Sequence, residues 1–261
     1  MKINVTHIDT ACILLEINGY RILTDPTLDH AGQLYHHGFG AFSRKTESPA
    51  LSAAELPPID LILLSHHQHK DNFDHNGKAF ALTVSKIIST KQASKAIPGI
   101  IGLDDWESCE VATPKLTHLT ITATPAQHRP WWVPELLSGK VIGFVIAFDE
   151  QEDGVIYISG DTVYFKGIEA VARKFKIDIG IFHMGAVQFR YLTGFGHYTL
   201  DSKGLMKAVQ VLNPNRIIPI HHKGWSHFKE KETTLKKVMA THDAVNNRTL
   251  FLTSGVSTVI Y

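Results

Sequence analysis

The chain has 261 residues, of which 44% are hydrophobic and 20% are charged, as in an ordinary globular protein with a sizeable core. The formal charge of +1, from 26 basic and 25 acidic residues, disfavours nucleic acid or an anionic membrane as the partner. The two cysteines give no disulfide framework or thiolate metal site, and favour a reducing compartment.

The N-terminus lacks the continuous apolar core of a signal peptide, and no segment approaches the ~18 apolar residues of a membrane span. We therefore expect a cytoplasmic protein. No linker or low-complexity segment divides the chain, so we predict a single domain over residues 1–261. The composition leaves a homo-oligomer open.

The opening of the chain has the pattern of a β meander. Residues 3–8, 11–17 and 20–23 predict strands, and Asn18-Gly19 between the last two is a strong hairpin signal. Residues 26–58 show no clear periodicity, and their length favours a functional loop or rim over a simple connection. The histidines of that segment are expected at the surface: His30, His36 and His37.

The apolar run 60–64 predicts a buried strand that leads into the densest polar cluster of the chain, residues 65–75. Open α/β sheets place their ligands at the carboxyl ends of strands. His67, His69 and Asp71 are spaced two apart, which in an extended loop points them the same way. Imidazole and carboxylate are the ligands that zinc and its neighbours prefer. A His-rich loop can also be a solvated turn.

Strands and helices alternate through the rest of the chain. Further strands are predicted at 87–90, within 100–124 with the last at 119–124, and at 141–148, 155–158, 178–182, 216–220, 248–252 and 256–260. Helices are predicted from about residue 76 and at 91–97, 165–175, 200–212 and 230–242.

Three more of these strands end on a candidate ligand, namely His128, Asp161 and His221. Each has a simple structural explanation, since His128 could cap a loop and Asp161 could be a helix N-cap. His221, with His222 beside it, could be a pocket histidine whose hydrogen bonds are all made. Together with the cluster after residue 64 they are hard to explain in that way. If the strands share one polarity, their ends meet at one edge and predict a metal site there.

The ordered set of motifs resembles the metallo-β-lactamase-fold hydrolases, and within them the branch that includes the ascorbate-phosphate lactonase. The resemblance covers most of the chain and rests on the His/Asp cluster and on four short motifs: Thr24-Asp25-Pro26, Thr124-Pro125-Ala126-Gln127-His128, Ser159-Gly160-Asp161-Thr162 and Pro219-Ile220-His221. It implies an α/β fold, the four-layer αββα sandwich, with one or two divalent metal ions on its edge. Zinc is the first expectation, and manganese or iron(II) also accept these ligands.

Carried over residue by residue, the resemblance implies two sets of metal ligands. The first metal would take His67, His69 and His128, the second would take Asp71 and His221, and Asp161 would bridge them.

This chain departs from the family's His-x-His-x-Asp-His cluster in two ways. Asn72 supplies a neutral amide where the last histidine is expected, so the second metal should be held more weakly or be absent. The strand end favours His66 as the first ligand, whereas the spacing favours His67. We keep both and give the spacing slightly more weight.

The expected function is a metal-dependent hydrolase in which a metal-bound hydroxide cleaves a small ester, lactone or phosphoester. His69 and Asp71 are the catalytic candidates, and Asp71 would orient the attacking water or carry its proton. Asp74 is the candidate that fixes a ligand histidine's tautomer. The histidines expected to reach the small-molecule substrate are His183, His197 and His227, and Trp131 and Trp132 are either a pocket wall or a packed loop.

Two alternatives stay open. One is a phosphodiesterase acting on nucleic acid or a phospholipid headgroup, although the near-neutral charge and the lack of a basic stripe speak against nucleic acid. The other is a non-catalytic metal-binding protein of the same fold, which Asn72 keeps in view.

Overall fold

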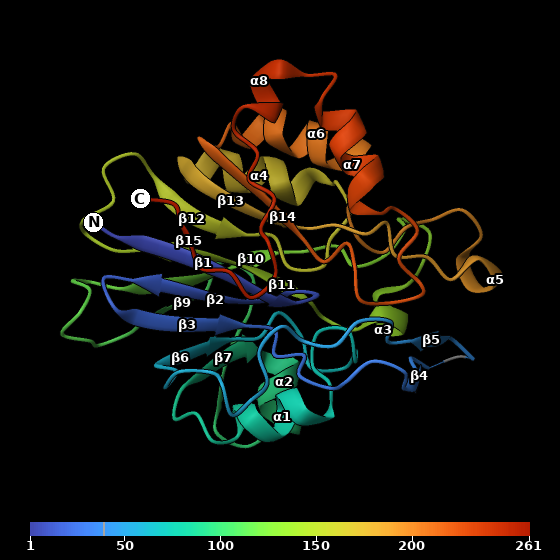
Figure 1. Ribbon diagram of the computed structural model, residues 1–261, viewed down its shortest axis with the longest axis horizontal. Coiled ribbons are helices and arrows are strands. Elements are labelled where there is room, and N and C mark those ends of the chain that lie inside the picture. Colours follow the sequence, from blue (N-terminus) through green and yellow to red (C-terminus); the bar gives the residue numbers. More distant parts are fainter. Residues whose placement is uncertain (39) are drawn as a thin grey trace.

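Two large β-sheets face each other in the computed structural model, which describes residues 1–38 and 40–261 (Figure 1). The first sheet has seven strands in the order β15 (Thr258–Val259), β1 (Ile3–Asp9), β2 (Cys12–Ile17), β3 (Tyr20–Thr24), β6 (Leu61–Leu63), β7 (Ile87–Thr90) and β8 (Ile100–Leu103). The second has six, in the order β14 (Arg216–Ile220), β13 (Ile177–His183), β12 (Val155–Ile158), β11 (Ile142–Ala147), β10 (Thr120–Pro125) and β9 (Ser108–Glu110).

Helices cover the outer face of each sheet (Figure 1). The helices α1 (His75–Ala81) and α2 (Lys91–Ala96) lie on the first sheet, and α4 (Lys166–Lys174), α6 (Ser202–Leu212), α7 (Glu232–Met239) and α8 (Asp243–Asn246) lie on the second. The result is the predicted four-layer αββα sandwich. Among the helices of the part that the structure describes, none is both long enough and apolar enough to cross a membrane.

The central strands are apolar throughout because both of their faces are buried. In β2, Ile13 and Leu15 pack in the core between the sheets, whereas Cys12 and Leu14 pack in the core beneath α1 and α2. Strand β13 is buried at every position, with Ile179 and Ile181 in the core between the sheets and Phe182 in the core beneath the helices. Such strands read as continuous hydrophobic runs rather than as alternating patterns.

Strand polarity brings four loops to one edge of the sandwich. Strands β12, β13 and β14 are parallel, and β10 runs in the same direction because it is antiparallel to β11, which is antiparallel to β12. In the first sheet, β6 runs parallel to β3 and β7. The carboxyl ends of β6, β10, β12 and β14 therefore carry the segments in which the candidate ligands were predicted.

Two local predictions differ from the structure. The strand predicted at 248–252 is a single bridge, in which Leu250 N donates to Ile217 O (2.8 Å) and Ile217 N donates to Arg248 O (2.9 Å) before the chain turns away. Within residues 26–58, a hairpin of β4 (Leu34–His36) and β5 (Phe42–Arg44) was not foreseen. Each of its strands buries only the central residue, so the sequence carries too few apolar positions to show a period.

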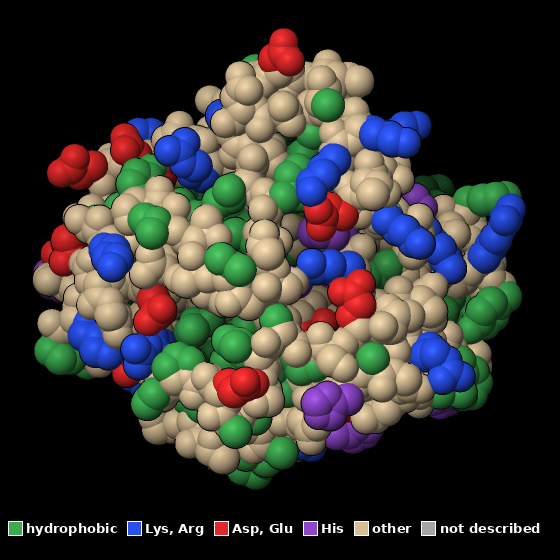
Figure 2. Space-filling view, viewed as in Figure 1, with side chains coloured by type: hydrophobic (Ala, Val, Ile, Leu, Met, Phe, Trp, Pro, Cys, Tyr) green, Lys and Arg blue, Asp and Glu red, His purple; other side chains and the backbone are tan. Residues whose placement is uncertain are grey.

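This hairpin lies at one end of the sandwich with the short helices α3 (Glu135–Ser138) and α5 (Arg190–Thr193) (Figure 1). Hydrophobic side chains gather at the surface along the end that carries α5 and the hairpin (Figure 2).

Candidate metal centre

Six side chains with metal-binding atoms gather where the strands end. They form two groups, in each of which the ligand atoms lie within 4.8 Å of one another: His66, His69 and His128 in the first, and Asp71, Asp161 and His221 in the second. The groups adjoin, because His128 Nδ1 lies 3.8 Å from Asp161 Oδ2. Residues from both halves of the chain therefore meet at one edge of the fold.

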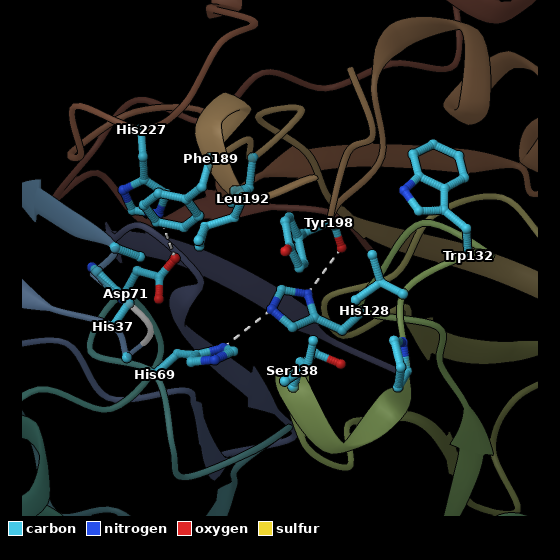
Figure 3. Close-up of a pocket in the computed structure, with 16 residues that line it drawn as sticks. His37, His69, Asp71, His128, Trp132, Ser138, Phe189, Leu192, Tyr198 and His227 are labelled. Atoms are coloured by element: carbon cyan, nitrogen blue, oxygen red, sulfur yellow. Dashed lines mark hydrogen bonds and ion pairs between the residues drawn. The ribbon is translucent and has the colours of Figure 1, made fainter. Parts of the chain in front are cut away.

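Three imidazole nitrogens converge in the first group. His69 Nδ1 lies 3.1 Å from His66 Nε2 and 3.1 Å from His128 Nε2 (the latter contact is dashed in Figure 3). Burial lowers the pKa of all three histidines, that of His69 to about 3, so the rings are neutral near pH 7. Three nitrogens around a tetrahedral zinc ion, each at about 2.05 Å, would be about 3.3 Å apart. The spacing therefore suits a shared cation.

Neighbouring groups fix which nitrogen of each ring is free. His128 Nδ1 donates to the carbonyl of Tyr198 (2.9 Å), which leaves a lone pair on Nε2. Ser65 Oγ donates to Asp25 Oδ1 (2.8 Å) and is then the acceptor for His66 Nδ1 at 2.9 Å, so His66 Nε2 is bare as well. A hydrogen on His69 Nδ1 could be donated to only one of the two unprotonated nitrogens, His66 Nε2 or His128 Nε2. A cation could accept a lone pair from all three nitrogens.

The second group is richer in oxygen. His221 Nε2 lies 3.7 Å from Asp71 Oδ2 and 3.6 Å from Asp161 Oδ1. His221 Nδ1 donates to the carbonyl of Met184 (3.1 Å), so Nε2 carries the lone pair. Among the described residues, His221 Nε2, Asp71 Oδ1 and Asp161 Oδ2 are buried and make no hydrogen bond. Buried carboxylate oxygens need a partner, and a metal ion would supply one.

Two further histidines hold the carboxylates in place. His183 Nδ1 donates to Asp161 Oδ1 (2.9 Å) and its ring stacks on that of His221, with centroids 5.6 Å apart. His227 Nε2 donates to Asp71 Oδ2 (2.9 Å). Burial by itself raises the pKa of both carboxyl groups, but nearby histidines and these hydrogen bonds outweigh it and hold each pKa below its usual range. Both carboxyl groups are therefore ionised.

The backbone is constrained at two of the strand ends. Gly160 has φ +60°, and a Cβ there would lie 2.4 Å from the carbonyl oxygen of Ile142, so the residue before Asp161 has to be glycine. His221 itself has φ +59°, an uncommon conformation for a residue with a side chain. Its amide donates to Thr10 O (2.8 Å), which helps to hold that conformation.

The loop after β6 places His66 and His67 in different surroundings. His66 is fully buried in the first group, whereas His67 is half-buried and belongs to neither group among the described residues. The spacing argument for His67 assumed an extended loop, but the chain bends after Leu64, so alternate residues do not share a side. The geometry thus favours His66, the residue nearer the strand end.

Asn72 and Asp74 lie in the same segment. Asn72 is fully buried, and neither polar atom of its amide has a hydrogen-bond partner within the described chain. Asp74 accepts hydrogen bonds from the amides of Leu28 (2.9 Å), Asp29 (2.8 Å) and Gly77 (2.8 Å), so it caps α1. The prediction that Asp74 fixes a ligand histidine is wrong, since backbone carbonyls and Ser65 do so instead.

A cavity of about 350 Å³ opens above the two groups (Figure 3). His69, Asp71, His128 and His227 line it, whereas the buried His183, which was also expected to reach the substrate, does not. His197 lies in a neighbouring cavity. His30 and His36 are exposed, as expected for a surface role.

The walls of this cavity hold residues that the sequence did not single out. His37 was expected at the surface, yet it is half-buried, lines the cavity and makes a 2.6 Å hydrogen bond with Ser43 Oγ. Phe189 and Leu192 line it as well. These residues come from loops and from the four-residue helix α5, where no apolar period could mark them. Of the two tryptophans, Trp132 lines the cavity and Trp131 does not.

Comparisons with known proteins agree with this architecture. The sequence model of the beta-lactamase superfamily domain matches residues 20–222, which include every candidate ligand. A UPF0173 metal-dependent hydrolase of Caldivirga maquilingensis is 25% identical over 240 residues, covering 89% of this chain and 88% of that protein. A UPF0173 metal-dependent hydrolase of Pyrobaculum aerophilum is 25% identical over 260 residues, covering 93% and 92%.

Two solved structures share the fold across nearly the whole chain. An isothiocyanate hydrolase from Delia radicum gut bacteria has a TM-score of 0.76 at 21% identity, covering 98% of both chains. A possible metal-dependent hydrolase from Veillonella parvula has a TM-score of 0.80 at 18% identity, covering 99% of both. The metallo-β-lactamase fold is thereby confirmed, and the narrower resemblance to the lactonase branch stays a prediction.

Proposed function

This chain belongs to the β-lactamase superfamily, and from that membership and its metal centre we propose that it is a metal-dependent hydrolase of a small ester, lactone or phosphoester. One observation carries most of the proposal. Among three neutral imidazoles, His69 Nδ1 lies 3.1 Å from a nitrogen of each of the other two, and in the second group each of the two carboxylates has one buried oxygen without a hydrogen-bond partner in the described chain. Cations at both positions would satisfy this arrangement.

The proposed ligands divide by group. His66, His69 and His128 would hold one divalent ion, and Asp71, Asp161 and His221 would hold the other. The donor atoms suit zinc, manganese or iron(II). Bound there, the metal would supply Lewis-acid chemistry, polarising the bond under attack and lowering the pKa of water toward about 7.

The remaining chemistry falls to side chains of the chain itself. His227 holds Asp71 through Oδ2, which leaves Oδ1 directed away from that bond and without a partner in the described residues. Asp71 Oδ1 would accept a hydrogen bond from the attacking water and so orient it. His183 orients Asp161 through its hydrogen bond, and the apolar side chains of the cavity would limit the access of bulk water to the reaction.

Metal analysis and a substrate panel test the proposal together. The purified protein should contain about one to two metal ions per chain. It should hydrolyse at least one member of a panel of esters, lactones and phosphoesters, and His69→Ala and Asp161→Ala should each abolish that activity. Less than about 0.1 metal per chain would count against a metal-dependent reaction, and full metal content without activity on any of these substrates would favour the non-catalytic alternative. Activity that survives both substitutions would exclude this mechanism.

A further inference from the structure

We propose that the cavity above the metal centre binds an uncharged substrate with an apolar group next to the scissile bond, namely a neutral carboxylic ester or lactone and not a phosphoester. The reaction in this statement rests on the proposed function. The binding preference rests on the cavity alone.

Apolar side chains from separate segments form the walls. Val133 and Leu137 come from the segment around α3, Val187 and Phe189 from the segment before α5, and Leu192 from α5 itself. Phe189 stacks on His227, with ring centroids 5.1 Å apart and the planes inclined by 13°, and Figure 3 shows the two on one side of the cavity. An apolar substituent at this wall would therefore lie close to Asp71, the partner of His227.

No lysine or arginine lines the cavity among the described residues. A phosphoester keeps charged oxygens that the reaction does not touch, and proteins usually meet them with arginine or lysine. Metal ions would attract the reacting oxygen of either class of substrate, so they do not distinguish the two. Beyond the metal ions, no lysine or arginine in the described lining would offset the desolvation of the remaining charged oxygens of a phosphoester.

Lysine side chains of the described chain line a neighbouring cavity but not the cavity above the metal centre. The neighbouring cavity shares the wall residue Trp132 and is lined by Lys166, Lys203 and Lys207. None of these three lysines lines the cavity that holds His69. The lysines of this region therefore belong to the neighbouring cavity and not to the one above the metal centre.

The apolar wall continues to the mouth of the cavity. Trp132, Leu137 and Leu192 line it and are also partly exposed, at 51%, 45% and 41%. Leu136, which is 91% exposed, continues the apolar surface outward. A volume of about 350 Å³ lies at the small end of ligand pockets, so an extended chain would leave through this mouth.

Adjacent residues provide matched variants for the test. Leu137 lines the cavity, and its neighbour Leu136 does not. Trp132 and Trp131 differ in the same way. Because all four side chains are partly or largely exposed, each substitution should leave the fold intact.

The first experiment compares metal-loaded enzyme on 4-nitrophenyl acetate, butyrate and hexanoate with 4-nitrophenyl phosphate. We expect kcat/KM to rise about threefold to fourfold per methylene until the cavity is full, and to be lowest for the phosphate. Leu137→Lys should raise the ratio of phosphate to butyrate hydrolysis about tenfold, whereas Leu136→Lys should not. Preference for the phosphate, or equal effects of the two lysine variants, would overturn the inference.

The second experiment separates binding from hydrolysis. Butyrophenone, a neutral ketone that cannot be hydrolysed, should bind by calorimetry at least about tenfold more tightly than its 4-carboxylate. Trp132→Ala should weaken that binding, and Trp131→Ala should leave it within about twofold. If no ester is cleaved while these results hold, the proposed reaction fails and the binding inference stands. If esters are cleaved but the carboxylate binds as well as the ketone, the binding inference fails alone.

Discussion

The two groups of the metal centre differ in their atoms and in their access to the cavity. The first presents three nitrogens, with His69 Nδ1 3.1 Å from each of the other two, and two of its members, His69 and His128, line the cavity. The second presents carboxylate oxygens 3.6 to 3.7 Å from His221 Nε2, and only Asp71 reaches the cavity. The first group is thus placed to act on a substrate. The second is a buried set of charges that need a cation for their own stability.

The largest expected effect tests the first group. His69→Ala removes the nitrogen that both 3.1 Å contacts share, and we expect kcat/KM to fall by at least about a thousandfold. His66→Ala should behave similarly. The matched control is His67→Ala, since His67 is half-buried and lies in neither group, and activity should stay within about threefold. Steady-state kinetics check this, and equal losses in His66→Ala and His67→Ala would refute the assignment.

Metal removal tests the claim about the second group. Chelation should lower the Tm of the protein by about 10 °C, because a bound ion at about a thousand times its Kd contributes about 4 kcal/mol. Asp161→Asn should lose most of this difference and should be more stable than the chelated wild type, since the amide carries no buried charge. Calorimetry with and without chelator measures both. An unchanged Tm on chelation would remove the case for a structural cation.

A smaller effect is expected from the residue that orients the second group. His183→Ala removes the 2.9 Å hydrogen bond to Asp161 and should weaken metal binding at that group by about 10- to 100-fold, with the first group unaffected. His183→Gln, whose amide can donate to the same oxygen, should recover part of the loss. His197→Ala is the control, since His197 pairs with Asp201 in the neighbouring cavity. Competitive metal titration distinguishes the two groups, and a loss shared by both would argue for a general structural role.

The same comparison explains what the sequence could predict. His128, Asp161 and His221 each follow a strand whose direction is fixed by its sheet, so a linear pattern was enough to bring them to one edge. The αββα layers were implied by the family resemblance, whereas apolar runs such as β2, in which both faces are buried, predicted only the individual strands.

What the sequence missed lies in bends and loops. Which of His66 and His67 joins the first group depends on how the chain bends after Leu64, and the spacing of residues in the sequence does not predict that bend. Asp74 was misjudged because its partners, Leu28 and Asp29, are 46 and 45 positions away in the sequence. The residues of the cavity walls lie in segments too short to show a hydrophobic periodicity in the sequence. Only the tertiary structure brings their side chains together at the cavity.

The smallest expected effect concerns Asn72, where the family pattern has histidine. Its amide is buried and without a partner in the described part of the chain, next to Asp71. If the weak amide ligand limits metal binding at the second group, Asn72→His should raise the metal affinity of that group by about tenfold. It should change kcat/KM by no more than about fivefold, because His69 and His128 of the first group line the cavity. Asn72→Ala should leave the affinity at or below that of the wild type. Metal titration and kinetics on the three proteins decide the matter. If Asn72→His bound less metal than the wild type, the amide of Asn72 would itself be a metal ligand that suits this site. The difference between the two groups would then depend on the asparagine.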